Sequence, residues 1–287
     1  MHPWVNTRDP LSVATRVHAD YVFLFPDSDP KFVSRAFGWA VDAFRGRFPG
    51  YLPVDTRYHD LEHTLQGTLC LSQLLRGRAE AEATPPLSKR TFELAILAIL
   101  LHDTGYLKKR FDKAGTGAKY TKTHVSRSCY FADCLLRHHG VADREISAVQ
   151  SMIRCTGMGT TPSNIHFDTE EYRIAGYALG TADLLGQMAA DDYIEKLPIL
   201  FEEFKESSHF NGAEAELFSS AEDLMQRTPA FWKRYVQPKI ESDFAGLFRY
   251  LAKPQPNGIN PYIDRIQENI SKLEQRLTDP LQISVKV

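Results

Sequence analysis

The chain has 287 residues, of which 43% are apolar and 24% are charged, so it can bury a sizeable core in one large domain or two small ones. Its formal net charge of −2 gives no global attraction to nucleic acid or to anionic membranes, and we expect neither as a partner. The longest apolar run, residues 94–101, is far too short to span a bilayer, and the N-terminus lacks the pattern of a signal peptide.

The four cysteines contain no C-x-x-C pair, which is typical of buried thiols in a reducing compartment. Together with the charge and the missing signal peptide, this leads us to expect a soluble, cytoplasmic protein.

Helical patterns dominate the chain, and no run has the convincing alternation of a β-strand. We expect an irregular N-terminal segment at residues 1–29, rich in Pro and Asp, and then a helical core at residues 30–210. The helices predicted in that core begin at Asp29 or Pro30 and then cover about residues 55–75, 88–104, 121–139, 143–154, 169–188 and 190–207. The helix at 88–104 is apolar nearly all round and should form the buried centre of the fold.

The last third of the chain carries many aromatic residues on helical patterns that are broken at Pro229. We expect these helices, at residues 211–252, to pack on the core, with a linker at 253–258. Residues 259–278 carry apolar side chains at steps of three and four, which is typical of an amphipathic helix. This helix either packs back on the body or pairs with another chain, which leaves a homodimer open. The overall prediction is an all-α multi-helix bundle.

The stretch RYHDLEH, residues 57–63, places His59 and His63 four residues apart. If the stretch is helical, both imidazoles lie on one face, with Asp60 and Glu62 turned away from it. Two imidazoles on one face can hold a metal ion, or one can bind it while the other moves a proton. The simpler alternative is two partly exposed histidines on a polar helix.

Two further sites place polar side chains among apolar ones. His102 and Asp103 end the central apolar helix, where an imidazole next to a carboxylate is costly unless each has a partner. A divalent cation would remove that cost, although a pair of helix-end caps is the simpler alternative. Asp183 is flanked by leucines, so it should be paired, metal-bound or facing a cavity. Nitrogen and oxygen ligands without a thiolate suit Zn, Fe, Mn, Ni, Co or a mixed Mg/Mn pair.

The order of these residues resembles the HD superfamily of metal-dependent phosphohydrolases, over roughly residues 30–210. That family's pattern is a His, an adjacent His-Asp pair and a distal Asp on helices of an all-α core, which here correspond to His63, His102-Asp103 and Asp183. The stretch YHDLEH is also similar to the Tyr-His-Asn-x-x-His motif of class I cyclic-nucleotide phosphodiesterases. That resemblance implies that His59 is a general acid and His63 a metal ligand, although this chain has Asp where the motif usually has Asn.

Other HD branches bind a second metal ion through extra histidines. His124 lies where the first of these would be, whereas the expected His-His pair falls near Arg154, Cys155 and Thr156. The resemblance therefore implies one tightly bound ion and a second, weaker ion held by Asp103 and His124. His138 and His139 lie too early in the chain for the pattern, and we interpret them as ordinary residues of a helix C-terminus.

The resemblance implies hydrolysis of a small-molecule phosphoester, such as a nucleotide or a cyclic-nucleotide-like phosphodiester. Asp103 would then bridge the ions and accept a proton from water, and His59 would protonate the leaving oxygen. Lys108 and Arg127 are candidates to contact the phosphate, although Lys108 is equally typical of a solvated helix end. Two alternatives remain, namely an HD-type diiron oxygenase and a non-catalytic regulatory HD module.

Overall fold

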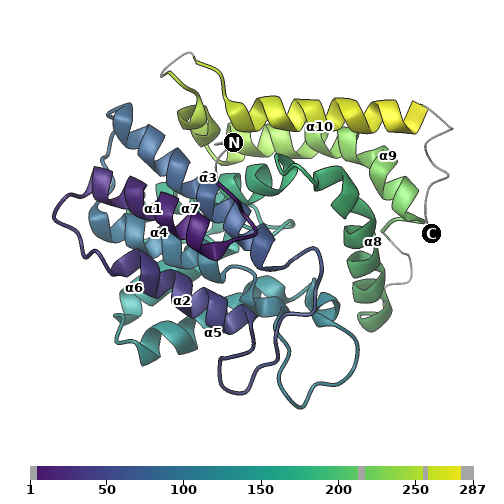
Figure 1. Ribbon diagram of the computed structural model, residues 1–287, viewed down its shortest axis with the longest axis horizontal. Coiled ribbons are helices and arrows are strands. Elements are labelled where there is room, and N and C mark those ends of the chain that lie inside the picture. Colours follow the sequence, from purple (N-terminus) through teal and green to yellow (C-terminus); the bar gives the residue numbers. More distant parts are fainter. Residues whose placement is uncertain (1–4, 213–216, 255–257, 279–287) are drawn as a thin grey trace.

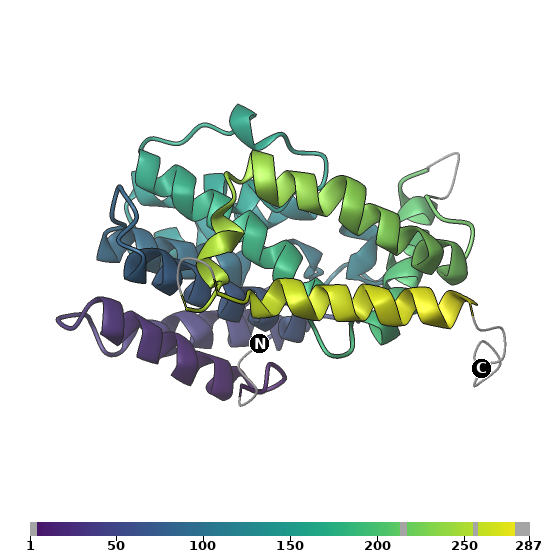
Figure 2. The same ribbon diagram turned by 90° about the horizontal axis from the view of Figure 1, so that it is seen from above.

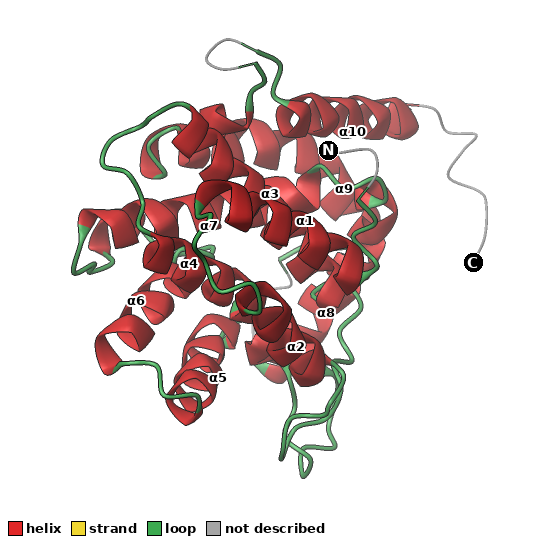
Figure 3. Ribbon diagram, turned by 60° about the vertical axis from the view of Figure 1, so that its left-hand side comes forward, coloured by secondary structure: helices red, strands yellow, loops and turns green. Residues whose placement is uncertain are grey.

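The computed structural model describes residues 5–212, 217–254 and 258–278. Within these residues the chain forms ten α-helices and no sheet strand, which confirms the prediction of an all-α bundle (Figures 1 and 3). The helices are α1 (Pro10–Leu24), α2 (Phe32–Phe44), α3 (Leu61–Glu80), α4 (Lys89–Leu101), α5 (His124–His138), α6 (Asp143–Arg154), α7 (Glu170–Met188), α8 (Tyr193–Phe210), α9 (Ala221–Phe231) and α10 (Pro261–Thr278). No helix in the described part of the chain has both the length and the apolar character that crossing a bilayer requires.

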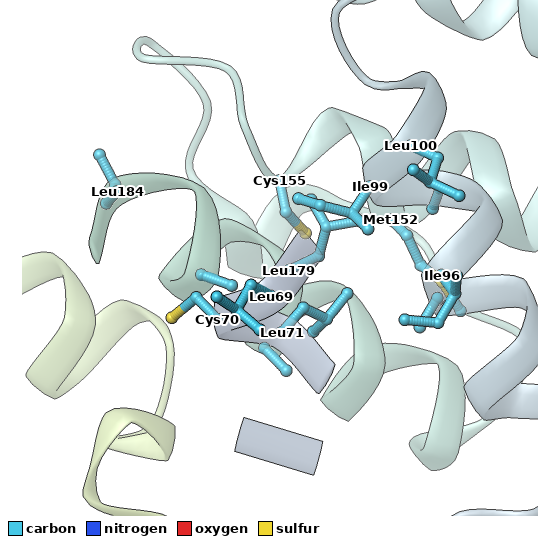
Figure 4. Packing of buried hydrophobic residues seen from close by; sticks show 14 of the residues in the cluster. Leu69, Cys70, Leu71, Ile96, Ile99, Leu100, Met152, Cys155, Leu179 and Leu184 are labelled. Carbon is cyan, nitrogen blue, oxygen red and sulfur yellow. The ribbon is translucent and has the colours of Figure 1, made fainter. Parts of the chain in front are cut away.

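The core lies around α4, in which every residue from Thr91 to Leu101 is buried. Helices α3 and α7 pack along each other beside it, and α6 packs against α4. Figure 4 shows these contacts, with Leu69 of α3 close to Leu179 of α7 and with Ile99 of α4 close to Met152 of α6. The central position predicted for the apolar helix is therefore correct.

Helices α3 and α7 approach closely because glycine stands at their contact. A Cβ atom at Gly186 would lie 2.8 Å from the backbone of Gln66 and Gly67, which is closer than real Cβ atoms approach. The absence of that atom lets the two backbones pack directly on each other. As a consequence, α7 holds Asp183 beside the first half of α3.

The prediction that residues 1–29 are irregular is wrong for Pro10–Leu24, which form α1. The carboxylate of Asp9 accepts hydrogen bonds from the backbone N–H groups of Leu11 and Ser12, and Pro10 occupies the first helical position. The Asp and Pro that we took as signs of irregular chain are therefore a helix-start signal. Residues 1–4 lie outside the described part.

Helix α3 begins at Leu61, later than the predicted start near residue 55. Asp60 caps it, because its side chain accepts a hydrogen bond of 2.9 Å from the backbone N–H of His63. His59 therefore precedes the helix, and the prediction that His59 and His63 share one helical face is wrong. Similarly, α4 ends at Leu101, and a short 3₁₀ turn follows at Thr104–Tyr106.

Residues 221–243 form a continuous helical path that Pro229 does not break. Helix α9 includes Pro229 and passes directly into wider, π-helical turns at Trp232–Val236 and Lys239–Asp243. Pro229 has no N–H group, so the helix continues here without the hydrogen bond that this residue would otherwise donate. The predicted break is thus wrong, and the buried side chains of this region pack on the core.

Helix α10 packs back on its own chain, against α7, α8 and α9, and Figure 2 shows its course across the molecule. Its buried side chains are Tyr262, Ile266, Asn269, Ile270 and Leu273. Asn269 donates hydrogen bonds of 2.9 Å to the carbonyls of Met188 and Ala190, and so caps the C-terminus of α7. The amphipathic helix therefore stabilises the helix that carries Asp183. Residues 255–257 of the predicted linker lie outside the described residues.

Three of the four cysteines are buried as expected, whereas Cys134 on α5 is exposed. The helix turns Cys134 toward solvent because α5 buries only its opposite face, which includes Cys129 and Ala132.

Candidate metal centre

The four predicted metal ligands converge from three helices. His63 lies in the first turn of α3, His102 and Asp103 follow the last residue of α4, and Asp183 lies in the second half of α7. The Nδ1 atom of His102 lies 2.7 Å from the carbonyl oxygen of Ile99. Because a carbonyl only accepts, Nδ1 donates, and Nε2 is the nitrogen that faces the other three residues.

The donor atoms of this cluster alternate between nitrogen and oxygen. Nε2 of His63 lies 3.2 Å from Oδ2 of Asp103 and 3.2 Å from Oδ1 of Asp183. Nε2 of His102 lies 3.3 Å from the same two oxygens. Ligands that share one ion at roughly 2.0–2.2 Å lie about 3 Å from one another, so these spacings fit a common ion.

Three atoms of the cluster are buried without a hydrogen-bond partner, namely Nε2 of His102, Oδ2 of Asp103 and Oδ1 of Asp183. The atoms are close to one another, but their angles do not form ordinary hydrogen bonds. Leaving three buried polar atoms unsatisfied at one point is costly. A cation would satisfy all three atoms. One donor atom each from His63, His102 and Asp103 lie within 4.8 Å of one another, which is close enough for the three residues to share a metal ion. The residues therefore fit a divalent ion.

The charges of the cluster depend on one another. Burial disfavours a charged His63, but the carboxylates of Asp103 and Asp183 outweigh it and raise the pKa of His63 to about 10. The pKa of His102 is raised in the same way, against burial and mainly by Asp103. Burial likewise opposes ionisation of both carboxylates, yet the two histidines hold their pKa values well below the usual range. Without a metal ion, protons on the two histidines therefore balance the charge of the ionised carboxylates, and a bound ion must displace these protons.

The second oxygen of Asp103 faces a different histidine. Oδ1 of Asp103 lies 3.9 Å from Nε2 of His124, the first residue of α5. Nδ1 of His124 lies 2.7 Å from the carbonyl of Thr121, and burial lowers the pKa of His124, which favours the neutral, metal-binding form. Asp103 thus lies between the other three residues of the cluster and His124.

Residues 154–156, where the HD pattern has a His-His pair, do not contribute to the cluster. Arg154 is exposed at the end of α6. Cys155 is buried, and its sulfur contacts the carbonyl of Ser151 rather than any residue of the cluster. Neither side chain therefore repels or binds a second ion at Asp103.

His59 lies beside the cluster but is not part of it. Its Nδ1 atom lies 2.6 Å from Oε2 of Glu203 on α8, and its ring centroid lies 5.4 Å from that of His63. The other oxygen of Glu203 accepts the backbone N–H groups of Arg57 and Tyr58, at 2.8 and 2.7 Å. One carboxylate thus fixes the whole segment before α3 and leaves Nε2 of His59 free.

Sequence reasoning missed Glu203 and Tyr106. Glu203 lies in a run of acidic residues next to Glu202, and nothing in the sequence distinguishes the two. Tyr106 follows the His-Asp pair by three residues, and its ring stacks on His59 with centroids 4.5 Å apart. The sequence offered one signal for Tyr106, because this aromatic residue directly follows Gly105 and lies close to the His102-Asp103 pair.

The two residues assigned to a phosphate have structural contacts. Lys108 is buried, forms an ion pair of 2.8 Å with Asp55 and donates to the carbonyl of Gly115. Arg127 donates to the carbonyls of Gly105 and Leu107, at 2.6 and 2.7 Å. These contacts hold the chain that follows the His-Asp pair, so both cations are engaged in the fold rather than facing an open site. His138 and His139 lie at the end of α5, as expected.

An open cavity of about 880 Å³ lies between residues 55–57, Thr116 and the face of α8 that carries Glu203. Glu203 therefore contacts both this cavity and the segment that holds His59. The cavity provides room for a small molecule beside the segment that precedes α3.

A family model described as Npun_R2479-like matches residues 108–275, which is more than half of the chain. The match includes His124, Asp183 and Glu203 but begins after the His-Asp pair. No curated protein matches the chain. The chain belongs to the Npun_R2479-like family.

Proposed function

We propose that this chain is a metal-dependent phosphohydrolase of the HD type. The observation that carries the proposal is the convergence of three buried, unpartnered donor atoms with Nε2 of His63. The order His63, His102-Asp103, Asp183 agrees with the HD pattern, and the all-helical fold agrees with an HD domain. The proposed substrate is a small phosphoester, such as a nucleotide or a cyclic-nucleotide-like phosphodiester.

The four-residue cluster would hold the tighter ion, with Asp103 shared with a second ion near His124. A bound divalent cation neutralises phosphoryl charge and provides a nucleophile from water near neutral pH. Imidazole and carboxylate donors suit Zn, Fe, Mn, Ni or Co, or Mg and Mn together, so the donor set leaves the metal's identity open.

His59 is the proposed proton donor to the leaving oxygen. A carboxylate only accepts, so Nδ1 of His59 donates to Glu203, and the opposite nitrogen, Nε2, is available to deliver a proton. Burial opposes ionisation of Glu203, but His59 and two backbone N–H groups keep its pKa below the usual value. The ionised Glu203 therefore accepts the Nδ1–H of His59 and orients the ring so that Nε2 points away from Glu203.

The structure favours hydrolysis over the two alternatives. Oxygen activation by two irons needs a fuller ligand set, and Arg154 and Cys155 do not supply the missing His-His pair. A non-catalytic regulatory module would not need to keep all four candidate ligands, nor three buried donor atoms without hydrogen-bond partners.

The test is a combined metal analysis and substrate screen of the purified chain. Hydrolysis of phosphomonoesters and phosphodiesters is measured with added Mn, Mg, Ni and Co, with the His102→Ala variant as the matched control. We expect metal-dependent hydrolysis that the variant lacks. Two bound irons with oxygen consumption would overturn the proposal in favour of oxidation, and a folded protein without metal affinity would favour a regulatory module.

A further inference from the structure

Tyr106 brings together two histidines that come from separate parts of the chain. Its ring centroid lies 4.5 Å from that of His59 and 4.7 Å from that of His124. The rings are nearly parallel, with interplanar angles of 14° and 18°. His59 precedes α3 and His124 begins α5, so the tyrosine is the shared contact between the proposed proton donor and the proposed ligand of the second ion.

Both imidazoles are also neighbours of each other. The centroids of His59 and His124 are 6.3 Å apart. The two imidazoles therefore share their contact with one buried ring, which we call the Tyr106 platform.

The backbone around the platform is built for close approach. A Cβ atom at Gly105 would lie 1.9 Å from the carbonyl oxygen of His124, and one at Gly117 would lie 2.1 Å from the carbonyl oxygen of Tyr106. Any side chain at either glycine would push the Tyr106 turn away from its neighbours. Tyr106 is 1% exposed, so its ring is enclosed and has no room to turn away.

Each imidazole otherwise has a single hydrogen bond, His59 to Glu203 and His124 to the carbonyl of Thr121. One bond at Nδ1 fixes a point on the ring but permits rotation about that point. The flat face of Tyr106 removes this freedom for both rings at once.

We propose that Tyr106 is a positioning residue for the proposed phosphoester hydrolysis, which sets the place of the proton donor relative to the second-ion ligand. The proposal rests on the proposed function, but the platform also makes a prediction about the protein without metal or substrate. Tyr106→Phe retains the flat ring, whereas Tyr106→Leu removes it and retains an apolar side chain.

Kinetics should show a double defect in Tyr106→Leu. We expect kcat to fall about 10- to 100-fold for esters with poor leaving groups, with KM nearly unchanged, because acid catalysis contributes on the order of 100-fold or more. The added metal concentration for half-maximal rate should rise about 10-fold, the usual scale for lost support of a metal ligand. His59→Ala should lower kcat only, and His124→Ala should raise only the metal concentration for half-maximal rate. Tyr106→Phe should keep both quantities close to their wild-type values.

The direct test is an NMR spectrum of the histidine ring protons in metal-free protein. The chain has 10 histidines, and the signals of His59 and His124 are identified by their loss in the two alanine variants. Stacking on Tyr106 should shift both sets of ring protons upfield in the wild type and in Tyr106→Phe. Both shifts should disappear in Tyr106→Leu. Tyr51→Leu is the matched control, because Tyr51 is also a buried ring but stacks on no histidine.

Unshifted signals in the wild type, or shifts that survive in Tyr106→Leu, would overturn the platform whether or not the protein is an enzyme. Correct shifts with no hydrolysis of any phosphoester would instead overturn the proposed function and, with it, the positioning role. If Tyr106→Leu fails to fold while Tyr51→Leu folds, the wild-type and Tyr106→Phe spectra still decide whether the platform exists.

Discussion

The two sides of the candidate centre are built in different ways. The proposed metal-binding side has its candidate ligands on or directly after helices α3, α4 and α7, which pack in the core. The proposed proton-donor side has His59 and Tyr106 on segments between α-helices. It is held by residues distant in sequence, above all by Glu203, which lies 144 residues from His59. Helix packing thus fixes the ligands, whereas a few hydrogen bonds and ring contacts fix the catalytic side. The first should tolerate change poorly, and the second should be adjustable without loss of metal.

The largest expected effect comes from removing a ligand. His102→Ala should lose the tight ion and more than about 100-fold of the hydrolytic rate, because even residues that only support a ligand contribute 10- to 100-fold to metal affinity. Elemental analysis of the purified variant and its hydrolysis rate measure the two losses. His138→Ala, at the exposed end of α5, is the control and should retain both. A variant that keeps its full metal content would remove His102 from the ligand set.

His59→Ala should separate the two sides of the centre. We expect it to retain the tight ion and to lose about 100- to 10,000-fold in kcat for esters with poor leaving groups, because a positioned acid contributes on this scale. An activated p-nitrophenyl ester should be affected much less. If His59→Ala loses its metal as readily as His63→Ala, then the division into a binding side and a proton-donor side is wrong.

Glu203→Gln is a smaller change that also tests whether the proposed proton-donor side can change without loss of metal. The amide oxygen can still accept the backbone N–H groups, but the amide NH2 group then faces Nδ1 of His59 and cannot accept its proton, so the hydrogen bond that orients the ring is lost. We expect kcat to fall about 10- to 100-fold while the metal content stays at the wild-type level. Glu195→Gln is the control and should be close to wild type, because Glu195 is an exposed residue of the same helix that pairs with Arg276. Equal effects of the two substitutions would exclude a specific role for Glu203.

The smallest expected effect concerns pH and the metal-binding side alone. In the metal-free protein the pKa of His63 is raised from 6.5 to about 10, so between these values the folded chain holds a proton that the unfolded chain releases. Stability from this source is complete below about pH 6.5 and is lost as the pH approaches 10. The free energy of unfolding of the metal-free protein, measured by urea denaturation, should therefore be lower near pH 9 than near pH 7.

Metal affinity should change in the opposite direction, because a bound ion displaces these protons and binds more tightly as the pH rises. His63→Gln is the control, since it removes the titrating group and should flatten the pH dependence of the metal-free protein. If the stability of the wild-type protein does not fall toward pH 9, then Asp103 and Asp183 do not stabilise the proton on His63.

The difference between the two sides also explains what could be predicted from the sequence. His63, His102, Asp103 and Asp183 stand out because polar residues at fixed intervals interrupt apolar helical patterns, and helix packing then brings them together. Glu203 does not stand out, because its role depends on a contact between α8 and residues 57–59 that no local pattern encodes. Tertiary contacts of this kind determine which residues form the proposed proton-donor side.

The errors in the fold have local causes. Asp9-Pro10 and Asp60 are capping residues, so the first marks a helix in a region that we expected to be irregular, and the second delays the start of α3 past His59. Pro229 lies inside a helix that continues into wider turns. Lys108 and Arg127 were candidates to contact a phosphate, but backbone carbonyls and Asp55 accept from their donors. For Asp9, Asp60, Lys108 and Arg127, the hydrogen-bond or ion-pair partner decided the role of the side chain.

The most direct test of the central claim is an anomalous diffraction experiment on crystals of the purified chain, recorded at the absorption edge of the copurified or added metal. We expect a strong peak between Nε2 of His63, Nε2 of His102 and the facing oxygens of Asp103 and Asp183, at about 2.0–2.6 Å from each. A weaker peak near Oδ1 of Asp103 and His124 would represent the second ion. A bound metal that lies elsewhere, or a cluster that stays empty at saturating metal, would exclude these residues as the metal site.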